Sequence, residues 1–306
     1  MNFLLKEIKQ FKKNKALFLL GLPAMIALFF VSYVPMFGLI IAFKNYTYDK
    51  GIFGSTWAGL NNFKFFFTSQ DAFRVTRNTL LLNSSFIILS FAFAVIVALM
   101  LNELSKRSVK VFQTVLFVPY FISWIVVGYL VYGFLSFDYG AINSILKTFH
   151  IAPIDWYSNP NYWPAILILS YLWKNVGYLT IIFYTGILGI DSTFYEAAEI
   201  DGATKFQQVR TITVPLIKPL IILMLMLSIG RIFYSDFGLF FFVPREVGAL
   251  LPTTDVIDTY VYRSLRVIGD LGMASAAGFY QSIVGFLLVM GTNLFIRKVS
   301  KEDAVF

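Results

Sequence analysis

Six long apolar stretches dominate the sequence and restrict the folds that it can adopt. A helix needs about 20 mostly apolar residues to cross a bilayer, and each stretch is long enough. Transmembrane β-strands would be about half that length and would alternate in polarity, whereas these runs are continuous. We therefore predict an all-α polytopic membrane protein with six transmembrane helices, near 17–43, 79–101, 111–135, 164–187, 217–241 and 276–296.

The composition indicates that lipid is the main solvent of this chain. Hydrophobic residues make up 58% and charged residues only 14%, which is too little polar material to cover a soluble protein of this size. The net charge of +8 then fits basic loops on an anionic membrane surface better than nucleic acid. The chain has no cysteine and one histidine, His150, which excludes thiolate metal sites and histidine-based catalytic triads within it.

The first apolar stretch follows a basic segment, 1–16, in the manner of a signal peptide. It continues to Phe43 without a small-residue cleavage site, so we predict an uncleaved first helix. Lysine and arginine are denser in the loops that lie inside when the N-terminus is inside, and the positive-inside rule then places both termini in the cytoplasm. With no repeat and no linker, 1–306 is expected to be a single membrane domain.

A charged, glycine-jointed segment, 192–215, separates the fourth and fifth apolar stretches. Asp191 is a good N-cap for a first short helix, and Gly202 can end that helix with a positive φ. A second short helix should follow and should be broken by Pro215 before the fifth span begins. Two short helices with a joint between them suit a groove on another protein, although a solvated linker would explain the same charges.

The residue spacing in this segment closely resembles the EAA loop of permease subunits from importers of the ATP-binding-cassette (ABC) class. The pattern is E-A-A-x-x-D-G-A, followed by I-x-x-P, with Val214 where leucine is common before the proline. In that family the loop contains the coupling helix, which docks into a cleft of the ATPase subunit. The resemblance therefore implies coupling to an ATPase through Glu196, Ala197, Ala198, Asp201, Gly202, Ala203 and Pro215.

The resemblance extends over nearly the whole chain, with about 75–297 as the conserved permease core. Residues 78–103 are similar to the entry into that core, and 255–289 to the branch that imports complex or polysaccharide-derived sugars. A type I ABC importer permease fold in the bacterial cell membrane is implied, with the coupling helix between spans four and five.

The resemblance also implies the partners of the chain. The sequence has no G-x-x-x-x-G-K-[ST] loop to hold ATP phosphates, so we expect no enzymatic activity and no cofactor on this chain, with ATP and Mg²⁺ on a partner. The implied partners are a second permease subunit, two ATP-binding-cassette ATPase subunits, an extracellular sugar-binding lipoprotein and an oligosaccharide substrate, besides membrane lipid.

The fourth apolar stretch carries polar and aromatic residues on one helical face. A sugar site needs aromatic platforms and hydrogen-bonding groups, and a lysine near the bilayer centre costs roughly 3 kcal/mol if it faces lipid. We therefore expect this face to line a substrate path; buried ion pairs that fix helix packing are the alternative. The residues, spaced i, i+3, i+4 and i+7, are Tyr171, Lys174, Asn175 and Tyr178.

Other stretches extend the candidate path. Arg231, Tyr234 and Asp236 lie in the predicted fifth span. Arg231 and Asp236 are five residues apart and should not share a helical face, so we expect Asp236 to pair with Lys174 or with a group on the second permease. The third span offers aromatic candidates, with lipid-facing positions as the alternative; they are Tyr120, Trp124, Tyr129 and Tyr132, of which Tyr132 is included in the path.

In the sixth span, close helix packing is expected along a stripe of small and polar residues, formed by Gly278, Gln281, Gly285 and Thr292.

An ion-coupled secondary sugar transporter, acting without an ATPase, is the alternative function. Such proteins usually show broken helices in corresponding halves and intramembrane acids. Asp236 is the only acid well inside a predicted span, and no inverted repeat is visible. A membrane enzyme has little support, because the chain lacks cysteines, clustered histidines and paired intramembrane carboxylates.

Overall fold

The computed structural model describes residues 14–299, so most of the predicted basic segment, 1–16, lies outside it. Five helices of the described part are long and apolar enough to cross a bilayer, and a sixth span results if the bent pair α6–α7 counts as one. The all-α polytopic class is therefore confirmed. The long helical elements are α2 (Lys15–Leu28) with its continuations η1 (Phe29–Tyr33) and η2 (Val34–Phe43), α5 (Gln70–Asn102), α6 (Lys106–Phe121), α7 (Trp124–Leu135), α9 (Trp163–Leu188), α12 (Val214–Ile229) and α16 (Leu271–Val299).

Short elements connect these helices. One two-stranded antiparallel sheet pairs Lys44 with Trp57 and Asn45 with Thr56. The short elements are β1 (Lys44–Asn45), α3 (Gly51–Gly54), β2 (Thr56–Trp57), α4 (Asn61–Thr68), α8 (Ala141–Thr148), η3 (Pro160–Tyr162), α10 (Ser192–Ile200), α11 (Lys205–Gln208), η4 (Val209–Thr213), α13 (Phe237–Phe242), η5 (Gly248–Leu250), α14 (Leu251–Thr254), α15 (Ile257–Arg263) and η6 (Ser264–Ile268).

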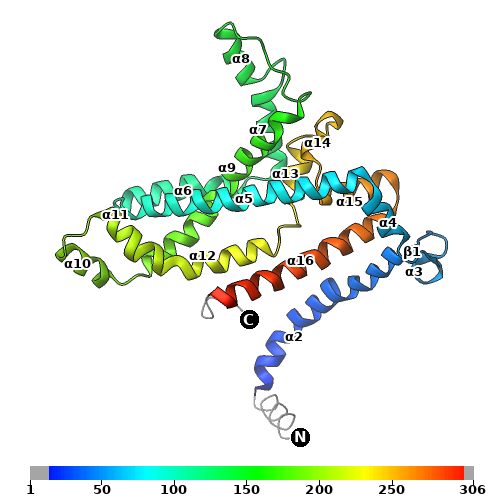
Figure 1. Cartoon of the computed structure of the whole chain (residues 1–306), viewed down its shortest axis with the longest axis horizontal. Helices are drawn as coiled ribbons and strands as arrows, with labels where there is room; N and C mark the ends of the chain where they lie inside the picture. The colour runs from blue at the N-terminus through cyan, green and yellow to red at the C-terminus, as the bar shows by residue number, and fades with distance from the viewer. Residues whose placement is uncertain (1–13, 300–306) are drawn as a thin grey trace.

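The long helices form an elongated bundle (Figure 1). Helix α5 packs against α9, and α9 packs against α6 and α12; α16 packs against α12, α15, α4 and η2. Helices α10 and α11 lie at one end of the bundle, and α3, α4 and β1 lie at the other (Figure 1). Helix α2 meets the bundle only near its η2 end, so its apolar side chains are mostly exposed and are suited to contact lipid.

The predicted third span, 111–135, is wrong as a single helix. Ile122 and Ser123 are extended, and the Ser123 hydroxyl accepts a hydrogen bond from the backbone N–H of Val126, which starts α7. The axes of α6 and α7 consequently differ by 99°. Hydropathy does not reveal this break, because Ser123 starts the new helix through a hydrogen bond of its hydroxyl, which a hydropathy average does not register.

The predicted fifth span, 217–241, is also wrong in its bounds. Helix α12 ends at Ile229, and 230–235 form turns before α13 begins. Asp236 caps α13 by accepting a hydrogen bond from Gly238 N at 3.1 Å. A short polar interval therefore stands where the apolar pattern predicted continuous helix.

Pro215 does not break the second short helix, contrary to the prediction. Helix α11, the π-helical turn η4 and α12 run on without interruption from Lys205 to Ile229. The backbone N–H of Val214 donates to Val209 O, five residues back. This wider turn provides space for the proline ring, which would clash with the carbonyl four residues earlier in a regular α-helix.

The packing expected along the sixth span is found at two of its positions. Gln281 is buried and donates from Nε2 to Phe233 O at 2.6 Å and to Asp258 Oδ2 at 3.2 Å. A Cβ on Gly285 would lie 3.6 Å from Gly230 O, so α16 approaches the end of α12 closely there. A Cβ on Gly278 would meet nothing within 4 Å, so that glycine is not needed for a close approach.

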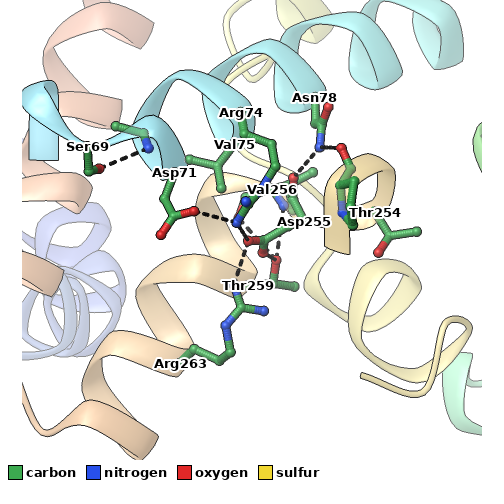
Figure 2. Close-up of polar contacts among 12 residues, drawn as sticks. Ser69, Asp71, Arg74, Val75, Asn78, Thr254, Asp255, Val256, Thr259 and Arg263 are labelled. Carbon is green, nitrogen blue, oxygen red and sulfur yellow. Dashed lines mark hydrogen bonds and ion pairs between the residues drawn. The ribbon is translucent and has the colours of Figure 1, made fainter. Parts of the chain in front are cut away.

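A buried carboxylate, Asp255, ties the start of α5 to the segment that contains α14 and α15 (Figure 2). Its Oδ2 accepts from Arg263 Nη2 at 2.5 Å and from Arg74 Nη2 at 3.4 Å, and its Oδ1 accepts from Thr259 Oγ1 at 2.8 Å. The amide of Asn78 donates to the backbone oxygen of Asp255 at 3.0 Å. One buried negative charge thus faces two guanidinium groups.

Asp255→Asn should lower the free energy of unfolding by about 3–5 kcal/mol, because two guanidinium groups would lose the buried charge that they share. Asp71→Asn is the matched control: Asp71 pairs with the same Arg74 at 2.8 Å, but its side chain is 49% exposed, so its loss should cost under about 1 kcal/mol. Thermal unfolding in detergent measures both variants, and equal losses would contradict this account.

Candidate functional site

A cavity of about 620 Å³ lies between α5, α9, α12 and the turn 230–236, with Tyr120 of α6 and Phe237 of α13 also in its wall. This volume lies within the range of pockets that bind small molecules. Six of the eight predicted path residues line it: Tyr171, Asn175 and Tyr178 from α9, and Arg231, Tyr234 and Asp236 from the turn.

Two stacked aromatic pairs form flat parts of the cavity wall. The rings of Phe86 and Tyr171 are parallel within 10°, with centroids 4.3 Å apart. The rings of Tyr120 and Tyr178 are parallel within 11° at 4.8 Å, and Phe117 stacks on Tyr120 at 5.7 Å. Such faces can pack against the apolar face of a sugar ring.

The charged groups of the cavity wall have different surroundings. Asp236 Oδ2 accepts a 2.6 Å hydrogen bond from Trp124 Nε1, and its Oδ1 accepts from Gly238 N. Arg231 is exposed, and within residues 14–299 its guanidinium has no ion pair or hydrogen bond. Of the two partners predicted for Asp236, Lys174 does not pair with it, because Trp124 and the start of α13 bind the carboxylate instead; a group on a second permease stays a prediction.

Lys174 binds the broken end of α6 and does not line the cavity, contrary to expectation. Its side chain is buried, and Nζ donates to Tyr120 O and Ile122 O at 2.6 Å each and to Pro119 O at 3.4 Å. The ammonium also lies 5.4 Å from the ring centroid of Trp124. The last carbonyls of a helix have no partner within it and attract a cation, so Lys174 acts as the C-terminal cap of α6.

A glycine on the same helix allows α6 to approach α9 closely. A Cβ on Gly177 would overlap the carbonyl of Leu116 in α6. The backbones of α6 and α9 can therefore touch, as small residues permit in membrane helix pairs. This contact lies one turn from Lys174 and brings the end of α6 within its reach.

Tyr132 lies on α7 and is not among the cavity-lining residues, so the structure does not bring it together with the other predicted path residues. Its ring instead lies under the guanidinium of Arg245, 4.0 Å from the ring centroid, and contacts Tyr157. Burial raises the pKa of Tyr157 to about 12. This aromatic cluster packs α7 against neighbouring loops.

Cavity residues on α5 were not identified from the sequence. Asn83 donates to Ile232 O at 2.7 Å and to Ser235 Oγ at 3.1 Å, which holds the turn 230–236 in place. Ser90 Oγ is buried without a hydrogen-bond partner among the described residues. The sequence pattern could have predicted them, because Asn83, Phe86 and Ser90 are spaced i, i+3 and i+7 and so share one helical face.

A second set of hydrogen bonds, from α15 and α16, also holds the turn 230–236. Ser235 N donates to Asp258 Oδ2 at 2.8 Å, and Gln281 reaches both Phe233 O and the same carboxylate oxygen. Burial raises the pKa of Asp258, although these hydrogen bonds act in the opposite direction. The turn is thus held by side chains from three helices.

The segment 192–215 forms the predicted pair of short helices with a glycine joint. Asp191 accepts from Thr193 N at 3.0 Å at the start of α10, and Gly202 ends α10 with φ +78°. Thr204 and Gln207 form a reciprocal capping box that starts α11. Of the predicted coupling residues, Glu196, Ala197, Asp201 and Gly202 are exposed, Ala198 and Ala203 are partly buried, and Pro215 lies further along, in α12.

An ion pair crosses the joint. Lys205 Nζ lies 2.8 Å from Glu199 Oε1. This hydrogen bond holds the pKa of Glu199 below its ordinary value and raises the pKa of Lys205. Both groups are exposed, so the pair contributes little stability. Two apolar side chains at the joint are also exposed, Ile200 at 87% and Phe206 at 74%.

Comparison with known proteins identifies the family. Residues 90–301 match the model of the family described as binding-protein-dependent transport system inner membrane component. The chain belongs to this family. The permease is 34% identical to protein LplB of Bacillus subtilis, over 95% of this chain and 91% of the relative. It is 35% identical to the polygalacturonan/rhamnogalacturonan transport system permease protein YteP of Bacillus subtilis, over 98% and 92%.

Solved structures agree with this assignment. The permease matches a chain of a bacterial ABC transporter involved in the import of the acidic polysaccharide alginate, with a TM-score of 0.87 and 31% identity over 96% of this chain and 99% of that one. It also matches a chain of the alginate transporter in complex with an alginate pentasaccharide-bound periplasmic protein, with a TM-score of 0.86 and 31% identity over 96% and 98%. The predicted family and the ABC importer permease fold are confirmed.

Lys174→Met should lower the free energy of unfolding by about 2–5 kcal/mol, because carbonyls at the end of α6 would lose a charged donor. Lys218→Met is the matched control, since Lys218 is exposed on α12 and has no ion pair or side-chain hydrogen bond among the described residues. Thermal unfolding in nanodiscs measures both. A loss no greater than that of the control would show that Lys174 does not cap α6.

Proposed function

We propose that the permease forms, with a second permease subunit, the translocation path of an ATP-driven importer for an oligosaccharide that an extracellular binding protein delivers. The family description includes dependence on a binding protein. One relative is named for polygalacturonan and rhamnogalacturonan transport, and the alginate transporter forms a complex with a pentasaccharide-bound periplasmic protein. These properties of similar proteins support a carbohydrate as the cargo here.

The cavity supports the same substrate class. Its stacked rings offer platforms. The amide oxygens of Asn83 and Asn175 and the hydroxyl oxygen of Tyr234 can accept hydrogen bonds from sugar hydroxyls, as a sugar site requires. The cavity belongs to one chain, and Tyr120 and Tyr178 on its rim are each more than one-third exposed. A second permease facing this side would complete the wall.

The exposed joint between α10 and α11 is the observation that carries the proposal of ATP-driven transport. Ile200 and Phe206 expose large apolar surfaces beside the exposed ion pair of Glu199 and Lys205, and such patches mark binding sites for other proteins. We propose that Glu196, Asp201 and the joint dock into an ATPase subunit. In this arrangement two such subunits bind ATP and Mg²⁺, and both termini of the permease lie in the cytoplasm of a bacterial cell.

Movement of the joint would reach the cavity through one continuous helix. Residues 205–229 run without a break from the joint to the turn 230–236, a path of roughly 35 Å at helical rise. Closure of an ATPase dimer would move α10 and α11 as a rigid body, and α12 would carry the displacement to Arg231 and Tyr234. This is a hinge mechanism without chemistry on the substrate.

An ion-coupled transporter that acts without an ATPase is less consistent with the cavity. Among the described residues, Asp236 is the only carboxylate that lines it, and both of its oxygens already accept hydrogen bonds. A proton or sodium site at Asp236 would have to displace them.

Gly202→Pro, Glu196→Lys and Ile200→Glu should each reduce ATP-dependent uptake by about tenfold or more while the chain still inserts. Proline cannot adopt the φ of +78° at Gly202, and the other two changes place unsuitable charge in the proposed contact. Uptake into proteoliposomes with the partner subunits measures this effect.

Ile151→Glu is the control for these variants, because Ile151 is an exposed isoleucine that lies after α8, away from the joint. It should leave uptake unchanged. Normal ATP hydrolysis and import with all three joint variants would remove the segment from the coupling role.

A further inference from the structure

We propose that the cavity selects oligosaccharides that carry carboxylate groups, and that Arg231 is the residue that binds the carboxylate. This inference rests on the proposed function and names the charge class of its substrate. It is carried by the guanidinium of Arg231, which is unpaired among the described residues, and by the aromatic faces in the same cavity.

Arg231 is the charged residue of the cavity wall whose side chain has no partner among the described residues. Among the lining residues only Arg231 and Asp236 are charged. The oxygens of Asp236 accept hydrogen bonds from Trp124 Nε1 and Gly238 N, so its negative charge is already solvated by the protein. The five N–H donors of Arg231 have no acceptor within the part of the chain that the structure describes.

The charges behind the cavity wall have partners of their own. Among the described residues no carboxylate lies within 4 Å of the Lys174 ammonium, which is bound by carbonyls and aromatic rings. The Asp258 carboxylate, which contacts the turn 230–236, accepts hydrogen bonds from Ser235 N and Gln281 Nε2. Neither group forms an ion pair with Arg231, so its guanidinium stays available to an anion in the cavity.

The turn that carries Arg231 is preorganised. Ile232 O accepts from Asn83 Nδ2 at 2.7 Å, Phe233 O accepts from Gln281 Nε2 at 2.6 Å, and Ser235 N donates to Asp258 Oδ2 at 2.8 Å. Because three side chains fix this backbone, Arg231 projects from a defined position, which lowers the entropic cost of binding.

The cavity combines this cation with the aromatic faces that a sugar ring needs. Tyr171 and Tyr178 line the same space as Arg231. A uronic acid residue joins a sugar ring to a planar carboxylate, and guanidinium binds carboxylate through two parallel hydrogen bonds. A ring stacked on a tyrosine can therefore present its carboxylate to Arg231, whereas a neutral hexose offers only uncharged hydroxyl acceptors, which bind a guanidinium more weakly.

The test is equilibrium binding to the complete complex in nanodiscs, without the binding protein, so that only the permease contributes selectivity. The probes are trigalacturonate and its carboxyl-reduced neutral counterpart. The wild-type complex should prefer the acid. Arg231→Gln should weaken binding of the acid by about 10- to 100-fold, as expected for loss of a hydrogen-bonded charge, and should change binding of the neutral sugar by less than about twofold.

Two further variants sharpen the result. Arg231→Lys should restore part of the preference, because it keeps the charge and loses the paired geometry. Arg266→Gln is the matched control, since Arg266 is exposed outside the cavity and should leave both affinities unchanged.

Equal binding of the two sugars, or an unchanged preference in Arg231→Gln, would overturn the inference. It would also be overturned if Arg231→Gln prevented assembly with the second permease, because Arg231 would then pair with that subunit. ATP-dependent uptake of neutral oligosaccharides separates the two proposals: if they are imported while the acid is not preferred, only the charge inference fails. If oligosaccharides of neither class are imported, the proposed function fails with it.

Discussion

The contact between the Lys174 ammonium and the end of α6 is the interaction on which the cavity depends. A helix that breaks inside a membrane leaves carbonyls without partners, and lipid cannot supply any. Lys174 supplies three donors at that point. It thereby fixes Tyr120, whose ring lines the cavity, and Trp124, whose indole binds Asp236. A residue that does not touch the cavity thus determines the shape of one wall.

The opposite wall depends on a second buried charge. Asp255 holds α5 and α15 together through Arg74 and Arg263. Helix α15 then presents Asp258 to the turn 230–236, and α5 presents Asn83 to the same turn. Both walls therefore rely on polar contacts that satisfy otherwise unpaired groups, and the apolar helices provide the frame around them.

The sequence predicted what hydropathy and local chemistry determine. The apolar runs located the helices, Asp191 and Gly202 marked the ends of α10, and the spacing of Tyr171, Asn175 and Tyr178 identified a face that does line one cavity. Coupling and substrate roles for these residues stay predictions, because geometry alone does not assign them.

The failures share a physical cause, since each depends on contacts between distant segments or on an uncommon backbone geometry. The break at Ser123 and the turn after Ile229 interrupt apolar runs that hydropathy reads as continuous. Pro215 fits its helix because η4 is a π-turn. Lys174 was expected to meet Asp236, but the carbonyls of a helix end, which a sequence pattern does not display, bind it instead.

In the turn 230–236, the contacts that hold the backbone are distinct from the Arg231 side chain that lines the cavity. Its backbone is fixed by side chains of α5, α15 and α16. Tyr234 is tied to α16 as well, through a 3.0 Å hydrogen bond with Ser282 Oγ, whereas the Arg231 side chain has no hydrogen bond or ion pair among the described residues. On the proposal that Arg231 binds the cargo, exchanges at this position alter cargo preference with little disturbance to the scaffold. Related permeases could then acquire different cargo preferences through substitutions in this one short turn, while α12 and the joint between α10 and α11 stay unchanged.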